Sequence, residues 1–259
     1  MLAYFFPLCI LDWPANCGVG YFQPNMVGRI ISGNEARPHS WPWQVSLQVQ
    51  MTIKTLQRDT FCCLSSAHLW TVLILDPQIL LGKHSINHAE STERFRYPHL
   101  NELDYDIALV KPVEDIVTNH FIHYACLPKR DSFLRPGHFC WVTGWGDIRG
   151  GNKNLTLSRV LNQAKLPVID FNTCRLQKFW GDRVRQSMIC AGFRDAGGPP
   201  GDSGGSLVCQ TGREKWEVHG VVSFGPIGCH AENKPSVFTR TSAFISWTEL
   251  RGAEETVSC

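Results

Sequence analysis

The chain lacks the features that mark several large classes of protein. Its 25 basic and 23 acidic residues leave a formal net charge of +2 over 259 residues, without a dense run of Lys and Arg. Such a surface attracts neither phosphates nor anionic lipids strongly, so we expect no nucleic-acid partner and no membrane partner. No apolar run approaches the length that spans a bilayer. An internal repeat of fixed period and a low-complexity stretch are missing as well.

Metal-binding patterns are also missing. No C-x-x-C pair and no cluster of His and Cys occurs, which argues against zinc. The stretch 82–91 offers Lys83, His84 and a single Glu90, which is a poor set of ligands for calcium. We therefore expect no cofactor and no metal.

Cysteine is the residue that the chain has in quantity. Eleven cysteines occur beside 22 glycines and 15 prolines, which predicts an oxidising compartment and hence a secreted, extracellular protein. Residues 1–11 are apolar and fit the hydrophobic part of a secretory signal, although a basic n-region and a clear cleavage site are missing. Asn154 opens a glycosylation sequon, which is usable if the chain is exported and that loop is exposed.

Short apolar runs between Gly, Pro, Asn and Asp predict an all-β barrel or sandwich, in one large domain or two smaller ones. The runs occupy residues 43–49, 78–81, 107–111, 140–143, 163–168, 206–209 and 216–224. Near the end of the chain the period changes. Phe244, Trp247 and Leu250 recur at helical spacing behind Thr241 and Ser242, either of which can cap a helix. This stripe predicts a terminal amphipathic helix that packs on the body.

Three segments carry the parts of a nucleophilic active site. A serine hydroxyl needs an adjacent base to take its proton, and the base needs an acid partner to hold its tautomer. Ser203 lies in the glycine-flanked turn PPGDSGGS, where the amides of Gly201 and Ser203 can form an oxyanion hole. His68 follows Ala67, and Asp106 precedes the apolar run. Taken singly, such a His is usually structural and such an Asp usually lies at a strand edge.

Taken together, these segments make the chain resemble the chymotrypsin-like (trypsin-fold) serine proteases from about residue 29 to residue 250. The resemblance is carried by RIISG at 29–33, WPWQVSL at 41–47, AH at 67–68, DIAL at 106–109, TGWG at 143–146, GDSGG at 201–205 and PSVF at 235–238. The stretches 223–225 and 234–240 look most like the pancreatic elastase branch. The resemblance implies two six-stranded Greek-key β-barrels with a C-terminal α-helix. It also implies a secreted serine endopeptidase with the catalytic residues His68, Asp106 and Ser203.

The resemblance further implies a zymogen. Cleavage between Arg29 and Ile30 frees the amino group of Ile30, which pairs with Asp202 and shapes the oxyanion hole. The expected parts are residues 1–29 (signal remnant and activation peptide), 30–252 (protease domain, with barrels 30–130 and 131–240 and helix 241–252) and a tail, 253–259. We expect a monomer that meets an activating protease, protein or peptide substrates and protease inhibitors.

Disulfides and a substrate pocket follow from the same resemblance. It implies the pairs Cys17–Cys126, Cys140–Cys209 and Cys174–Cys190. At the pocket floor Gly197 stands where trypsin-like enzymes carry an acidic residue, so we expect cleavage after uncharged, small to medium apolar residues, unless Asp195 swings in. Gly225 and Ser236 would form pocket walls. Ser223, Phe224 and Gly225 would pair with the substrate backbone as an added strand, with Phe224 replacing the Trp common in the family.

The departures from the family pattern lie beside the catalytic centre. Leu69 follows His68 where the family has a Cys, a β-hairpin of the first barrel is missing, and the segment 92–103 is too short for the usual strand and loop. These losses predict an incomplete first barrel with exposed strand edges. Pro199 also replaces a Cys in the nucleophile loop. The cysteines without a family partner are Cys9, Cys62, Cys63, Cys229 and Cys259, so either they find new partners or the reading frame skips exons.

Three hypotheses result from these observations. The first, which we favour, is a working endopeptidase. The second is a protease-shaped binding or vestigial protein whose damaged first barrel does not hold the triad in register, because a displacement of about 1 Å can cost roughly a hundredfold in rate. The third, a structural disulfide-rich module, leaves the triad and the activation junction unexplained.

Overall fold

The computed structural model places eleven stretches of the chain and the single residue 158. The stretches are 13–26, 33–49, 57–62, 64–65, 69–72, 104–110, 117–144, 160–192, 204–212, 214–226 and 233–249. In the strands of the first half after Gln44, only the backbone is described. None of the helices in these stretches combines the length and the apolarity that crossing a membrane requires.

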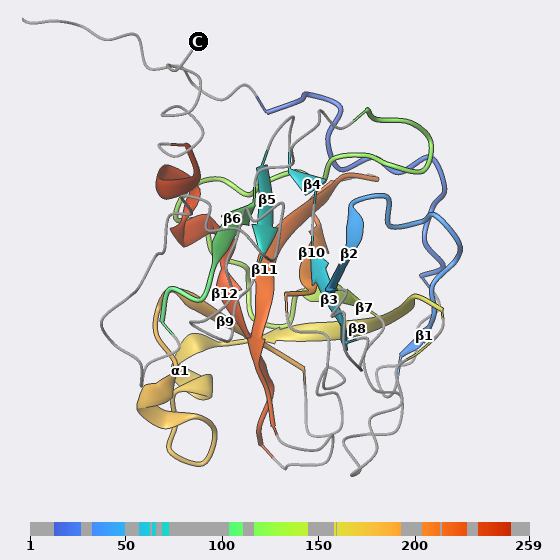
Figure 1. Cartoon of the computed structure of the whole chain (residues 1–259). Coiled ribbons are helices and arrows are strands. Elements are labelled where there is room, and N and C mark those ends of the chain that lie inside the picture. Colours follow the sequence, from blue (N-terminus) through green and yellow to red (C-terminus); the bar gives the residue numbers. More distant parts are fainter. Residues whose placement is uncertain are drawn as a thin grey trace, which may run out of the picture.

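A closed six-stranded barrel forms the second half of the molecule (Figure 1). Its neighbouring strands pair in the order β8, β7, β10, β11, β12, β9, and β9 pairs again with β8. All of the pairings are antiparallel. The strands are β7 (Phe139–Gly144), β8 (Asn162–Ile169), β9 (Met188–Ala191), β10 (Ser206–Gln210), β11 (Trp216–Phe224) and β12 (Ser236–Arg240). The predicted runs 140–143, 163–168, 206–209 and 216–224 therefore all lie in barrel strands.

The interior of this barrel is filled by side chains from opposing strands. Leu166, Leu207 and Phe238 are at most 1% exposed and pack in one cluster with Cys140. Burying each such apolar side chain contributes roughly 1.5–3 kcal/mol. The short strand β1 (Asn34–Glu35) lies outside the ring, paired with β8. The closed barrel with its filled interior is therefore a rigid scaffold that can hold functional side chains at the ends of its strands.

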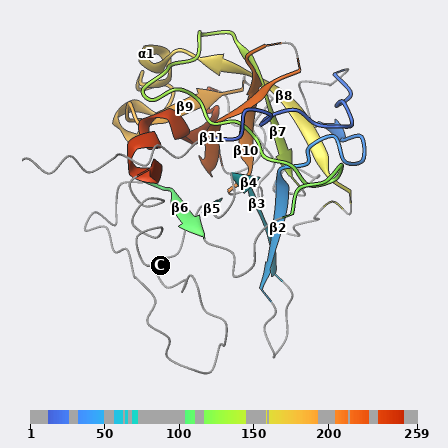
Figure 2. The same ribbon diagram turned by 90° about the horizontal axis from the view of Figure 1, so that it is seen from above.

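The first half contributes two smaller sheets among the residues described. The strands β2 (Gln44–Val49) and β3 (Gln57–Cys62) pair as a hairpin, and β4 (Leu64–Ser65), β5 (Leu69–Val72) and β6 (Ala108–Val110) form a three-stranded sheet. Figure 2 shows these strands gathered on one side of the second barrel. The predicted runs 43–49 and 107–111 lie at β2 and β6. The predicted run 78–81 and the short segment 92–103 lie outside the described residues.

The helices are short. The α-helix α1 (Phe171–Cys174) is capped by Asp170, whose carboxylate accepts from the amide of Thr173 at 3.0 Å, and a 3-10 turn, η1, spans Gly181–Arg183. The predicted terminal helix begins as a 3-10 turn, η2 (Thr241–Ala243), and continues as α-helix over 245–249.

The terminal helix packs on the body as its stripe predicts. Phe244 is 7% exposed, and its ring lies 6.4 Å from that of Trp247. Neither predicted cap is seen in that role. The hydroxyl of Ser242 instead donates to the carbonyl of Ser132 at 2.7 Å and accepts from the guanidinium of Arg240 at 2.9 Å.

Candidate active site

Asp106 lies in a tight turn immediately before β6. Tyr105 has a φ of 63°, and the amide of Ile107 donates to the carbonyl of Tyr105 at 2.8 Å. The Asp106 carboxylate accepts a hydrogen bond from the Ser223 hydroxyl at 2.6 Å, and its main-chain carbonyl accepts from the Thr239 hydroxyl at 2.8 Å. Ser223 belongs to β11 and Thr239 to β12. Asp106, which belongs to the first half of the chain, is thus fixed to two strands of the second barrel.

Further contacts hold the same turn. The Ser187 hydroxyl donates to the carboxylate of Asp104, and the ring of Tyr105 meets that of Phe244 edge-on at 5.8 Å. The turn is therefore also attached, through Asp104 and Tyr105, to the residue before β9 and to the C-terminal helical segment. Such attachment restricts the rotamers of Asp106, which a residue with a positioning role requires.

Partial burial changes the acidity of Asp106. Burial raises the pKa of its carboxyl from 3.8 to about 6, and the hydrogen bond from Ser223 lowers it in part. The carboxylate is half-buried and ionised at neutral pH, so it favours a cationic or hydrogen-bonding neighbour. A perturbed carboxyl of this kind is typical of functional sites.

A β-bulge explains why Ser223 reaches Asp106. Val222 pairs with Phe238 and Phe224 pairs with Val237, which leaves Ser223 as an extra residue on β11. Bulges redirect side chains and are frequent beside active sites. Ser223 is only 2% exposed. The contact of the Ser223 side chain was not predicted, and the signal that could have indicated it is a hydroxyl within the apolar run 221–224.

The residues predicted for the substrate pocket lie together at the end of the same two strands. A Cβ atom added at Gly225 would lie 3.6 Å from the hydroxyl oxygen of Ser236. The ring of Phe224 meets that of Trp180 edge-on at 5.1 Å, and the Trp180 indole N–H donates to the carbonyl of Pro235 at 2.9 Å. The exposed Gly225 therefore lies next to the half-buried ring of Phe224 and the buried hydroxyls of Ser223 and Ser236.

The nucleophile itself and several other predicted residues lie outside the described residues: Arg29, Ile30, His68, Asn154, Gly197, Gly201, Asp202 and Ser203. The residue that follows Ser203 is described. Gly204 donates from its amide to the carbonyl of Val222 at 3.1 Å, and Val222 donates to the carbonyl of Gly205 at 2.8 Å. The turn after Ser203 is thus bonded to the strand position directly before Ser223.

The predicted approach of His68 to Asp106 stays a prediction, because His68 lies outside the described residues. Leu69, the residue after His68, is the first residue of β5, and the pairs Trp70–Val110 and Val72–Ala108 place it at the end of the sheet away from Asp106.

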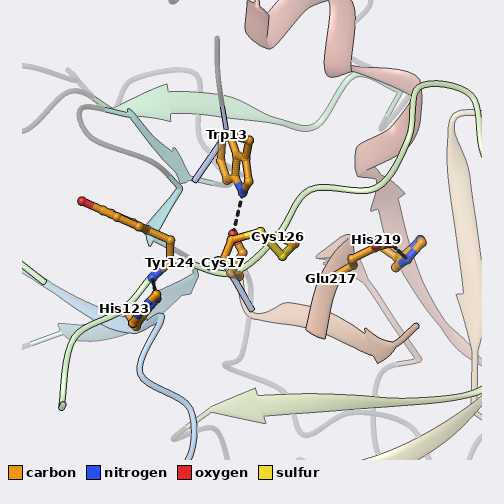
Figure 3. Close-up of a disulfide and its surroundings, with 8 residues drawn as sticks. Trp13, Cys17, His123, Tyr124, Cys126, Glu217 and His219 are labelled. Atoms are coloured by element: carbon orange, nitrogen blue, oxygen red, sulfur yellow. Dashed lines mark hydrogen bonds and ion pairs between the residues drawn. A yellow bond between two sulfur atoms is a disulfide. The ribbon is translucent and has the colours of Figure 1, made fainter. Parts of the chain in front are cut away.

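The segment before the predicted cut is attached to the second barrel. Cys17 and Cys126 form a disulfide, and the Trp13 indole N–H donates to the carbonyl of Ala125 at 3.0 Å (Figure 3). Gly18 has a φ of 71°, and a Cβ atom there would lie 2.3 Å from the carbonyl oxygen of Trp216. A side chain at this position is therefore excluded. The other described disulfides join Cys140 to Cys209 and Cys174 to Cys190, so all three pairs are those that the resemblance implies.

Both sides of the predicted cut are fixed to one residue of β8. The buried side chain of Gln163 donates to the carbonyl of Asn25 at 2.7 Å and accepts from the indole N–H of Trp41 at 2.8 Å. In the strand register Gln163 pairs with Asn34. Residues 25 and 34 are therefore both held at Gln163.

Comparison with known proteins agrees with this arrangement. The family model described as Trypsin matches residues 30–248, and the chain belongs to this family of serine proteases. Chymotrypsin-C of Bos taurus is 35% identical over 254 residues, which cover 92% of this chain and 94% of that protein. Chymotrypsin-C of Mus musculus is 35% identical over 261 residues, with 92% and 94% covered. Chymotrypsin-like elastase family member 1 of Canis lupus familiaris is 35% identical over 244 residues, with 86% and 92% covered.

Proposed function

We propose that this chain binds extended protein or peptide segments in the way that a serine endopeptidase binds its substrates. The segment would pair with the backbone of Ser223–Gly225, and its uncharged side chain would enter the pocket beside Gly225 and Ser236. The position of Gly225 beside Ser236 supports this, because a side chain at residue 225 would contact the Ser236 hydroxyl at 3.6 Å and occupy space that the glycine leaves open. Gly197 would offer no countercharge to a basic side chain.

The chemistry expected at this site is acyl transfer to Ser203. Ser203 would attack the peptide carbonyl, the amides of Gly201 and Ser203 would stabilise the oxyanion, and Asp106 would be the acid partner of the base. One observation carries this proposal. Ser223 binds the Asp106 carboxylate at 2.6 Å, and Val222 next to it binds the turn that follows Ser203. Acid partner and nucleophile loop thus meet on adjacent residues of β11.

We further propose that the chain is made as a secreted precursor. The disulfide between Cys17 and Cys126 supports this, because it would tether residues 1–29 to the domain 30–252 after cleavage at Arg29. Disulfides persist in oxidising compartments, which fits an extracellular monomer that can be glycosylated at Asn154. An activating protease would then free Ile30 to pair with Asp202, and protease inhibitors would compete for the pocket.

A second candidate function uses the same surface without hydrolysis. The register of β5 and β6 is the observation behind it, since it places Leu69 at the end of the sheet away from Asp106. In this case the chain binds peptides and releases them intact. Both candidates share the substrate site, and they differ in whether a base reaches Ser203.

Peptide binding tests the shared proposal without requiring turnover. The chain cut at Arg29 would be titrated calorimetrically with a short peptide that ends in Ala or Leu, and with the same peptide ending in Lys. We expect the uncharged peptide to bind more tightly, and Gly225→Val to weaken it about tenfold or more, which is 1.4 kcal/mol or more. Equal affinity for both peptides, or for wild type and Gly225→Val, would show that the pocket is not the binding site.

A further inference from the structure

The exposed apolar side chains of the described residues are concentrated in two segments, 19–26 and 117–122. Eleven large apolar side chains are exposed in the described part of the chain, and six of them belong to these segments: Val19, Tyr21, Met26, Val117, Phe121 and Ile122. Single exposed apolar residues are ordinary on a protein surface, whereas a contiguous group of them indicates an interaction site. The two segments run side by side (Figure 1), and their rings are in contact.

Rings from three segments pack against one another on this surface. The ring centroids of Tyr21 and His120 are 4.2 Å apart, and the rings of Phe22 and Phe121 are stacked with centroids 6.1 Å apart. His39 adds a fifth ring, whose centroid lies 4.6 Å from that of Phe121 and 5.8 Å from that of Phe22. We call these five residues the aromatic patch. Tyr21 is 67% exposed and Phe121 is 53% exposed, so the patch presents ring surface to solvent.

Local hydrogen bonds hold the patch in this form. The side-chain oxygen of Asn119 accepts from the amide of Phe121 at 2.8 Å and from that of Ile122 at 3.0 Å, which fixes the turn that carries the Phe121 ring. The amide of His123, next in the chain, donates to the carbonyl of Pro42 at 3.1 Å. A surface that is already held in one form loses little conformational entropy when a partner docks on it.

The charge around the patch favours an acidic partner. No Asp or Glu occurs in the described segments that form and adjoin it, 13–26, 36–44 and 117–126. The nearest acidic residue in the sequence is Glu35, on β1. The guanidinium carbon of Arg37 lies 5.9 Å from the centroid of the Phe22 ring, and the exposed imidazoles of His39 and His120 offer further N–H donors. A carboxylate of a partner would therefore meet a cation and hydrogen-bond donors at the patch.

We propose that the aromatic patch is a docking surface for another protein, which presents an apolar side chain flanked by Asp or Glu. Aromatic residues and Arg are enriched at protein–protein contacts and supply most of their strongest single contributions. One Arg is too few for a nucleic acid, because that binding depends on neutralising several phosphates. The docking surface uses none of the residues of the substrate site proposed above, so it adds a second binding function to the chain.

Amide NMR of the isotopically labelled, uncut chain tests this with two short peptides. Acetyl-Glu-Leu-Phe-Glu-amide is the acidic probe, and acetyl-Lys-Leu-Phe-Lys-amide is its counterpart with the charges reversed. We expect the acidic probe to shift the resonances of 19–22 and 117–122 and to bind about fivefold more tightly than its counterpart, as one exposed ion pair typically allows. Phe121→Ser should weaken the acidic probe about tenfold or more. Arg37→Ala should remove most of the preference for it.

Phe139→Ser is the matched control. Phe139 is 45% exposed and has the ammonium group of Lys165 at 4.5 Å from its ring centroid, so it also joins an exposed ring to a cation. This variant should leave the affinity unchanged, and so should Gly225→Val in the substrate site. Equal affinity for the two peptides, or no binding of either at millimolar concentration, would overturn the proposal.

Two further outcomes would assign the patch to a different occupant and would overturn the proposal as well. One is self-association in analytical ultracentrifugation that Phe121→Ser abolishes and Phe139→Ser does not, because a second copy of the chain would then cover the patch. The other is binding to phosphatidylserine vesicles that depends on Phe121, with no binding of the acidic peptide.

Discussion

The hydroxyl of Ser223 binds the carboxylate of Asp106 at 2.6 Å, although the two residues are 117 positions apart in the chain. This contact joins the turn before β6 to the bulge of β11. It fixes one member of the candidate site independently of the first-half strands.

Removing the charge of Asp106 is expected to stabilise the fold at neutral pH. Because the folded-state pKa of about 6 lies above 3.8, the folded chain binds the proton more tightly than the unfolded chain does. Raising the pH through that window therefore costs stability. Asp106→Asn keeps an oxygen that accepts from Ser223 and has no charge to desolvate. Thermal unfolding should show a Tm advantage of Asp106→Asn over wild type that grows from about pH 4 to pH 7. A constant or shrinking difference would contradict the burial argument.

Ser223→Ala is expected to raise the pKa of Asp106 further. The hydroxyl stabilises the ionised carboxylate, so its loss favours the protonated form. Carbon-13 NMR of the carboxyl resonance would follow the titration. Thr239→Val is the matched control, because it removes a hydrogen bond to the main-chain carbonyl of the same residue and leaves the carboxylate untouched. Equal titration midpoints in wild type and Ser223→Ala would exclude the hydrogen bond as a cause.

Gln163→Leu is expected to speed proteolysis at Arg29. It removes the hydrogen bond that holds Asn25, and a buried hydrogen bond of about 1 kcal/mol corresponds to roughly a fivefold change in local opening. Trypsin digestion followed by mass spectrometry would compare the cleavage rate at Arg29 with that at other Lys and Arg sites. Trp41→Phe serves as the control, since it removes the other bond of Gln163 and leaves Asn25 bound. Acceleration at all sites alike, in both variants, would indicate general destabilisation.

The disulfide between Cys17 and Cys126 is expected to retain the N-terminal segment after cleavage. With both cysteines replaced by Ser, cutting at Arg29 should release that segment on a non-reducing gel, whereas wild type should release it only with reductant. The loss of this crosslink should also lower the free energy of unfolding by about 2–4 kcal/mol. Retention in the doubly substituted chain would mean that the noncovalent contacts of Trp13 and Gly18 suffice.

Much of the second barrel could be predicted from the sequence. Four of its strands coincide with apolar runs, because buried strands in a closed barrel need apolar side chains on the inner face. Two strands were missed. The strand β12 ends in Arg240, a charged residue that is 6% exposed because its guanidinium donates to Gln186 and lies over the ring of Phe133. The strand β9 is only four residues long and lacks a distinctive pattern.

The candidate site was predicted in part. Asp106, Ser223, Gly225 and Ser236 do lie together, since the family motifs that contain them also determine the barrel strands that carry them. The approach of His68 and Ser203 to Asp106 stays a prediction, because both residues lie outside the described stretches.

A crystal structure of the chain cut at Arg29 would test the proposed active site through one distance, that between the ring of His68 and the carboxylate of Asp106. The account predicts that the Asp106 carboxylate remains bound to Ser223 and also accepts a hydrogen bond of about 2.6–3.2 Å from the ring of His68, whose other nitrogen faces Ser203. A His68 ring that lies beyond hydrogen-bonding reach of that carboxylate would contradict it.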